Sequence, residues 1–261
     1  VAAPLYVSFS LWLLKQLRRS DVATVYFLAR EGEVLFEIAQ ILNERFQLGL
    51  DLRYLYVSRQ SVNGGLLTSA DESNIALTLT HSDSQTLRGM LDRCGLTPES
   101  VRDELELAGF GEAVWEAPLA PGARKRFLQC ISSGRPRERI EEAAGPVREK
   151  IEAYLNQEGF FQTDRIAVVD TTGTGSQIRA LHLLRKAENL PDLEGFLMIR
   201  DWKQAMVDQG FPTIHAYIAD HYAKKGWTHF PGLIQMLEVF SRTGRGTVLR
   251  YKPCSGRIYA V

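Results

Sequence analysis

The sequence predicts an α/β fold: a mostly parallel, twisted sheet with flanking helices and a large helical insertion. Two observations support this prediction. Short, largely apolar runs rich in β-branched and aromatic residues, typical of strands in a parallel sheet, occupy residues 22–28, 52–57, 166–169 and 193–199. Residues 63–162 carry only helical patterns separated by Gly and Pro, which indicates a helical insertion between two strands of the sheet.

The composition allows one large domain with an insertion and argues against a polyanionic partner. Of the 261 residues, 45% are hydrophobic, and 31 Lys and Arg balance 31 Asp and Glu. A net charge of zero argues against general nucleic-acid binding, although a local basic cluster can still hold a phosphorylated small molecule. The three cysteines are scattered and form no C-x-x-C pair, as expected of reduced thiols in a cytoplasmic protein.

The N-terminal residues 5–17 predict an amphipathic helix packed on the sheet. Polar residues interrupt their apolar pattern, and the charged front and cleavage site of a signal peptide are missing. We therefore expect a cytoplasmic protein, located at most peripherally at the inner face of the membrane. Val1 stands where an initiator Met would be, so we expect the chain to be a piece of a longer protein.

Three segments follow from these patterns. Residues 1–62 are the N-terminal part of the α/β core, residues 63–162 the helical insertion or cap, and residues 163–261 the C-terminal part of the core with a glycine-rich loop. An insertion of this size makes a cap or a partner-recognition surface, or it lengthens the core. The further elements that we expect are helices at 34–49, 87–91, 101–107, 123–131, 137–155 and 231–240 and closing strands at 247–251 and 257–261.

A strand, a loop of small residues and a helix succeed one another around Asp170. This carboxylate ends the run 166–169, four small residues occupy 172–175, and the spacing of the following apolar residues is helical. Such a loop directs unpaired backbone N–H groups and the positive end of a helix dipole to one spot, which suits a phosphate. The alternative is that the glycines only form a tight turn.

The loop matches neither of the two best-known nucleotide-binding patterns. A P-loop requires a lysine directly after its second glycine, and no lysine follows Gly175. Ile178 stands where a dinucleotide fold needs a third Gly or Ala, and Asp170 precedes the glycines instead of lying beyond them. A carboxylate beside a phosphate cradle instead matches a sugar that carries hydroxyls next to a phosphate.

Other predicted strand ends also carry polar residues or glycine. Ligands of open α/β sheets bind in the crevice at the carboxyl ends of the strands, so these residues are candidates for the same site. For the arginines, the alternative is an ordinary surface position in a turn. The residues at these strand ends are Arg30, Gly32, Ser58, Arg59, Arg200 and Asp201.

Residues 168–175, Val-Val-Asp-Thr-Thr-Gly-Thr-Gly, resemble the phosphoribosyl diphosphate-binding loop of type I phosphoribosyltransferases. The resemblance implies a phosphoribosyltransferase-like fold, in which acidic residues reach the ribose hydroxyls and a Thr/Gly turn holds the 5-phosphate. Asp170 corresponds to an acidic position and residues 172–176 to the phosphate cradle. The usual second acid is absent, because Thr171 follows Asp170.

A closer resemblance covers nearly the whole chain. Residues 26–32, 54–60, 168–170 and 236–240, with Gly246 and Tyr251, are similar to the transferase half of dual-domain bacterial ribofuranosyltransferases. In that family the transferase moves 5-phosphoribose from phosphoribosyl diphosphate to a growing surface polysaccharide, and a haloacid dehalogenase-type phosphatase domain then removes the 5-phosphate. The resemblance implies a lipid-linked glycan acceptor, Mg²⁺ as cofactor, and a phosphatase domain elsewhere in the full-length protein. The chain departs from the family pattern at Glu31, where Asp is more common, and at residues 171–172, where a bulkier pair is common.

The resemblance and the chemistry of the transfer imply roles for individual residues. Asp170 is expected to contact the ribose and Mg²⁺, and one of Glu31, Asp201 and Glu238 to take the proton of the acceptor hydroxyl. For Glu238 the alternative is a helix carboxylate satisfied by its neighbours. The expected phosphate- and donor-binding residues are Thr171, Thr172, Gly173, Thr174, Gly175, Ser176, Arg30, Gly32, Ser58, Arg59 and Arg200.

Two other functions stay open at this point. The missing second acid suggests a non-catalytic, phosphoribosyltransferase-like module that binds a phosphorylated ligand or a partner. The glycine-rich loop also leaves room for a nucleotide-dependent enzyme with an unusual loop.

Overall fold

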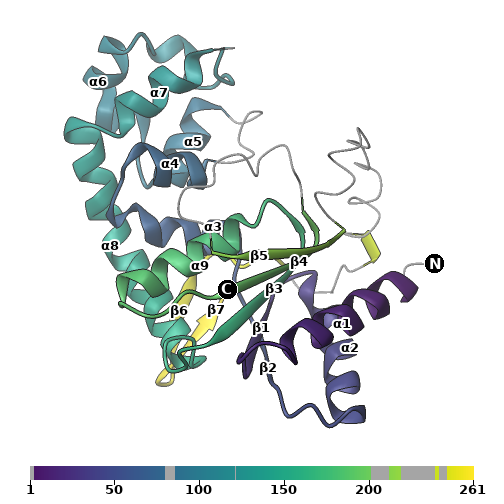
Figure 1. The fold of residues 1–261 in the computed structure, drawn as a ribbon. Helices are drawn as coiled ribbons and strands as arrows, with labels where there is room; N and C mark the ends of the chain where they lie inside the picture. Colours follow the sequence, from purple (N-terminus) through teal and green to yellow (C-terminus); the bar gives the residue numbers. More distant parts are fainter. Residues whose placement is uncertain (1–2, 80–85, 121, 201–211, 219–238, 241–245) are drawn as a thin grey trace. The chain divides into compact units, whose positions relative to one another are not determined.

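The computed structural model describes residues 3–79, 86–120, 122–200, 212–218, 239–240 and 246–261. The chain divides into two compact units, each drawn in Figure 1. The sheet unit comprises Val1–Ser58, Leu155–Val248 and Ala260, and the helical unit comprises Arg59–Tyr154, Leu249–Tyr259 and Val261. No helix in the described part of the chain is long and apolar enough to span a membrane.

The sheet unit contains a five-stranded sheet whose described strands all run parallel, in the order β2-β1-β3-β4-β5. This confirms the predicted α/β class. The central strands β1 and β3 are fully buried except at the end of β3, which explains their continuous apolar sequence. The strands are β1 (Thr24–Leu28), β2 (Asp51–Leu55), β3 (Ile166–Gly173), β4 (Glu194–Arg200) and β5 (Ile214–Ile218).

Helices cover both faces of this sheet (Figure 1). Helices α1 (Ala3–Leu17) and α2 (Gly32–Arg45) share one hydrophobic core with Val169 of β3 and Phe196 of β4. Helix α9 (Ser176–Ala187) packs on the other face of the sheet. Neighbouring strand residues point to opposite faces, so Gly195 faces away from the core that contains Phe196. A Cβ atom built on Gly195 would lie 2.9 Å from Ile178 Cγ2 of α9. Side chains of β3 therefore alternate between the α1/α2 face and the α9 face.

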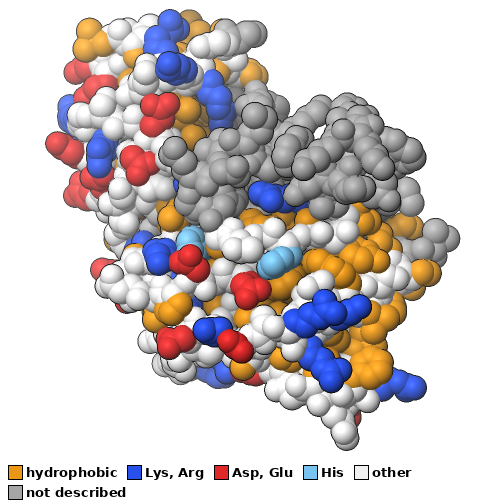
Figure 2. Space-filling model, in the orientation of Figure 1, with side chains coloured by type: hydrophobic (Ala, Val, Ile, Leu, Met, Phe, Trp, Pro, Cys, Tyr) orange, Lys and Arg blue, Asp and Glu red, His pale blue; other side chains and the backbone are white. Residues whose placement is uncertain are grey.

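The helical unit has its own hydrophobic core. Trp115 and Phe127 are among its largest fully buried side chains. On the face drawn in Figure 2, Lys and Arg side chains are interspersed with Asp and Glu side chains over these helices, as on a solvated surface. The helices are α3 (Arg59–Asn63), α4 (Glu72–Thr78), α5 (Leu87–Arg93), α6 (Arg102–Leu107), α7 (Ala123–Ile131) and α8 (Gly134–Gln157), with short 3₁₀ helices at Gly64–Thr68, Pro98–Val101 and Glu112–Val114.

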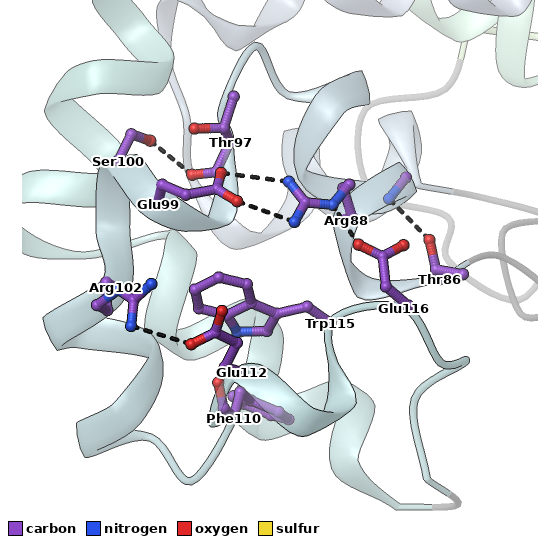
Figure 3. Close-up of polar contacts among 11 residues, drawn as sticks. Thr86, Arg88, Thr97, Glu99, Ser100, Arg102, Phe110, Glu112, Trp115 and Glu116 are labelled. Carbon is purple, nitrogen blue, oxygen red and sulfur yellow. Dashed lines mark hydrogen bonds and ion pairs between the residues drawn. The ribbon is translucent and has the colours of Figure 1, made fainter.

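A polar cluster around Trp115 links helices α5 and α6 to the 3₁₀ helices at Pro98–Val101 and Glu112–Val114 and to Glu116 (Figure 3). The guanidinium groups of Arg88 and Arg102 lie 5.9 and 5.1 Å from the Trp115 ring centre. Arg88 also pairs with Glu99 at 2.9 Å and with Glu116 at 2.5 Å. Hydrogen bonds from Arg88 lower the pKa of the Glu99 carboxyl to about 2. The cluster is exposed on its outer side, so its role is to hold loops against a buried indole.

The C-terminal hairpin belongs to the helical unit. Its strands are β6 (Tyr251–Cys254) and β7 (Arg257–Ala260), and Ser255 and Gly256 connect them with positive φ angles. Tyr251 stacks on Tyr154 of α8 with ring centres 4.7 Å apart, and its hydroxyl lies 3.2 Å from the Ser61 hydroxyl. Burial raises the pKa of Tyr251.

Several element boundaries differ from the sequence predictions. Strand β5 was not predicted, because Ile214–Ile218 is a short, half-buried strand with His215 at its second position and lacks the apolar run of the central strands. The first closing strand begins at Tyr251 and not at residue 247, and α2 ends at Arg45, before Gly49. Most of the predicted helix 231–240 lies outside the described residues.

Candidate functional site

The strand order places a topological switch point between β1 and β3. The chain leaves β1 through α2 toward β2, on one side, and leaves β3 through α9 toward β4, on the other. The two connections diverge at the carboxyl ends of neighbouring strands, and ligands of open α/β sheets bind in the crevice that this divergence opens. The loops that begin there are residues 29–31 and residues 174–175, with the last residues of β3.

Asp170 lies on the α9 face of β3, just before the strand ends. Its side chain is 7% exposed. Its Oδ1 accepts a hydrogen bond of 2.8 Å from the backbone N–H of Thr171, and its Oδ2 accepts one of 3.5 Å from Nε2 of Gln177. A nearly buried carboxylate is therefore held in one orientation at the switch point.

The glycines after Asp170 have backbone conformations that other residues rarely adopt. Gly173 has φ 124° and Gly175 has φ 81°, and Gly175 is the N-cap of α9 without a side-chain cap. The first backbone N–H groups of α9 consequently lack the side-chain acceptor that an Asp or Ser at this position would supply. A Cβ atom built on Gly173 would meet no atom within 4 Å, so the loop has open space beside it.

The hydroxyl residues of the loop divide into two groups. Thr171, Thr174 and Ser176 are buried, whereas Thr172 is partly exposed. A ligand can therefore contact the backbone N–H groups and the partly exposed positions 172–173, whereas the other hydroxyls of the loop are buried.

Arg200 ends β4 directly beside this loop. It is the register partner of Gly173 in the parallel pairing of β3 with β4. Its Nε is buried and has no hydrogen-bond partner among the described residues. A buried guanidinium donor without an acceptor is unfavourable, so this position is suited to receiving an anion. Asp201, the next residue, lies outside the described part of the chain.

The loop after β1 carries an internal ion pair. Nε and Nη2 of Arg30 donate to Oε1 of Glu31 at 2.9 and 2.7 Å. The side chains of Arg30 and Glu31 are 37% and 18% exposed. Tyr54 of β2 supports the loop by donating its hydroxyl to the backbone carbonyl of Arg30 at 3.3 Å. The Ala29–Arg30 peptide bond is cis, and Gly32 begins α2 as a buried residue.

The remaining predicted residues are not placed in these loops. The Ser58 hydroxyl, three residues beyond β2, is buried and donates to the carbonyl of Val248 at 2.5 Å, which is a structural contact within the sheet unit. Arg59 is exposed and begins α3 in the helical unit. Glu238 lies outside the described residues.

Sequence reasoning missed Gln177. It occupies the first turn of α9, from which a side chain points back toward the end of β3. The available signal was its spacing of seven residues from Asp170, across a strand end, a turn and a helix start.

No metal cage of protein side chains is evident in the described ranges. Among these residues, no group of three or more His, Cys, Asp or Glu side chains lies where it could hold a metal ion. His215 stacks on Phe196 with ring centres 4.8 Å apart, and its Nε2 lies 3.4 Å from the Glu194 carboxylate.

Comparison with known proteins adds no family to this description. No protein-family model matches the chain, and no curated protein matches its sequence. The functional argument therefore starts from the chemistry of the switch point.

Proposed function

We propose that this chain transfers a 5-phosphoribosyl group from phosphoribosyl diphosphate to a hydroxyl of a surface-polysaccharide glycan, with release of pyrophosphate, and that its sheet unit is of the phosphoribosyltransferase type. The observation that carries the proposal is the combination, at one switch point, of the nearly buried Asp170 carboxylate with the glycine cradle at the start of α9. A sugar phosphate has matching groups, since its hydroxyls need an acceptor and its phosphate needs donors.

The cradle after β3 suits the 5-phosphate. Gly173 leaves room for an anion to approach the backbone, and the start of α9 after Gly175 directs N–H groups and a positive dipole toward it. Arg200 lies at the register position of Gly173 on the α1/α2 face of β4, and in the proposal it contacts the donor from that side of the strand ends. In the proposal, Thr171, Thr172, Thr174 and Ser176 complete the cradle.

The carboxylate and the second loop suit the rest of the donor. Asp170 accepts hydrogen bonds from the ribose hydroxyls. Arg30 binds the diphosphate by exchanging Glu31 for a phosphate oxygen, an exchange that its partial exposure permits. Gly32 lets the backbone approach, whereas the Ser58 hydroxyl is engaged by the carbonyl of Val248.

The transfer breaks the bond between the anomeric carbon and the diphosphate oxygen, and the bonding electrons leave with pyrophosphate. The acceptor oxygen forms the new bond from the opposite side, so the α configuration of the donor becomes β. A carboxylate takes the acceptor proton, which typically contributes about 10²- to 10⁴-fold to the rate. Among the three candidates for this base, only Glu31 lies in the described part of the chain. When Arg30 moves to the diphosphate, the carboxylate of Glu31 is released to act as the base. Asp201 and Glu238 are the other two candidates.

For Mg²⁺, the proposed site offers one protein ligand, the carboxylate of Asp170, together with the phosphates of the donor. Mg²⁺ is commonly held by one or two carboxylates together with substrate phosphates, and Asp170 offers one carboxylate next to the proposed diphosphate position. Bound there, the ion would neutralise charge on the departing pyrophosphate. The acceptor in this proposal is a lipid-linked glycan, and a haloacid dehalogenase-type phosphatase domain elsewhere in the full-length protein removes the 5-phosphate.

Pyrophosphate release tests the proposed reaction. The protein is incubated with phosphoribosyl diphosphate, Mg²⁺ and lipid-linked or synthetic glycans, and pyrophosphate is measured with and without acceptor. We expect acceptor-dependent release, and a Gly175→Leu variant should lose it, because a side chain at φ 81° disrupts the cradle. The absence of release with every glycan would refute the transferase proposal.

A non-catalytic binding module is the second candidate. Two observations favour it. Residues 170–171 carry a single acid, and the ion pair with Arg30 occupies the carboxylate of Glu31, the candidate base in the described part of the chain. This module would bind phosphoribosyl diphosphate tightly and yet form no product in a single-turnover experiment with enzyme in excess. Product formation in that experiment decides for the enzyme.

A further inference from the structure

Gln177 is a polar residue at the switch point to which the reaction above gives no role. Its Nε2 donates to Oδ2 of Asp170 at 3.5 Å. Its Oε1 is buried and has no hydrogen-bond partner among the described residues. A buried amide oxygen without a donor is unfavourable, and most such atoms in proteins are paired.

The orientation of the Gln177 amide follows from its neighbour. Turning the amide over would bring Oε1 next to the carboxylate oxygen of Asp170, where two acceptors would face each other. The amide therefore points its donor at Asp170 and keeps its acceptor for another group. Gln177 lies in the first turn of α9, two residues after Gly175.

We infer that Gln177 substitutes for the missing second acid, by orienting the Asp170 carboxylate and by accepting a hydrogen bond from one hydroxyl of the sugar. The inference rests on the proposed function. It assigns Gln177 as a positioning residue for Asp170 and as a specificity residue for a ligand with two adjacent hydroxyls.

A ribose diol donates two hydrogen bonds. The Asp170 carboxylate already accepts from the N–H of Thr171 and from Nε2 of Gln177, and the Gln177 oxygen adds a further acceptor beside it. Thr171 occupies the position of the usual second acid. The Gln177 oxygen supplies an acceptor without adding a negative charge next to Asp170, where a second carboxylate would repel it.

Binding of ribose 5-phosphate and its deoxy analogues tests this role. Ribose 5-phosphate, 2-deoxyribose 5-phosphate and 3-deoxyribose 5-phosphate are titrated by calorimetry into the wild type and into Gln177→Leu. The control is Gln40→Leu, the same change at an exposed position of α2 in the sheet unit. We expect the wild type and the control to prefer ribose 5-phosphate over one of the two analogues by about 2- to 12-fold, the range for one hydrogen bond, and Gln177→Leu to lose that preference.

The outcomes separate this inference from the proposed function. If the wild type binds neither ribose 5-phosphate nor phosphoribosyl diphosphate, the proposed function fails and the inference falls with it. If the wild type binds with the expected preference and Gln177→Leu keeps it, only the inference is refuted. A Gln177→Leu variant that weakens ribose 5-phosphate and both analogues by the same factor also refutes it, because Gln177 would then have a purely structural role.

Discussion

Gly173 provides a direct test of the backbone geometry that the proposed site requires. Its φ of 124° is in a region that L-residues rarely adopt, and a Cβ atom built there would meet no atom within 4 Å. Substitution by Ala therefore strains the backbone without a steric clash. A residue forced into such a conformation costs about 1–3 kcal/mol.

A matched substitution separates this effect from the general consequences of replacing glycine. Gly111 has φ −62° and ψ 168°, which any L-residue adopts, and a Cβ atom there would also meet no atom within 4 Å. Gly111→Ala should stabilise the protein by about 0.4–1 kcal/mol, since Ala reduces the conformational entropy of the unfolded chain. The two variants add the same methyl group to open space and are expected to act in opposite directions.

Thermal and urea unfolding measure both effects. With about 2–4 °C per kcal/mol for a chain of this size, Gly173→Ala should lower the melting temperature by about 2–12 °C and Gly111→Ala should raise it by about 1–4 °C. Gly173→Ala should also weaken the binding of ribose 5-phosphate, because the strain is in the cradle. A Gly173→Ala variant as stable as the wild type, with unchanged binding, would show that the backbone at residue 173 adapts freely and would refute the argument for a preformed cradle.

Three further predictions address the carboxylate and the two units. Asp170→Asn should weaken phosphoribosyl diphosphate binding by about 10- to 100-fold in calorimetry, because it removes a charged acceptor; an unchanged dissociation constant would remove Asp170 from the site. Arg185 is fully buried and donates to the carbonyls of Phe160, Thr163 and Asp164, so Arg185→Met should destabilise the protein by about 3 kcal/mol or more in urea unfolding, and a loss below about 1 kcal/mol would contradict this. The pKa of Glu99 is lowered to about 2 by Arg88, so the stability from this ion pair is present above about pH 4.5 and is lost as the pH falls toward 2. In melting curves recorded from pH 7 to pH 2, Glu99→Gln should show a shallower loss of stability below pH 4.5, and a curve parallel to the wild type would refute this.

The sequence predicted the fold class because the central strands are buried on both faces. Parallel strands covered by helices are apolar along their whole length. Residues 24–28 and 166–169 can therefore be recognised as strands from their own sequence, without knowledge of the strands that pair with them. The glycine turn before α9 was predictable for a similar reason, since the backbone at residues 173 and 175 needs positive φ and glycine adopts it at little cost. The strand before it continues to Gly173, however, and does not end at residue 169 as predicted. Strand β5 was missed because its half-buried residues have no comparable pattern.

Only the tertiary structure decided which polar residues belong together. The strand order 2-1-3-4-5 brings the loop at residues 29–32 beside the loop after Asp170, and parallel register places Arg200 opposite Gly173. Strand order and register depend on residues far apart in the chain and cannot be derived from any short segment of the sequence. The sequence alone therefore could not show that Ser58 makes a structural contact while Arg200 lies beside the loop. Gln177 was overlooked for the same reason: its importance depends on an amide oxygen that is buried without a partner, and the burial of a single atom is a property of the packed structure.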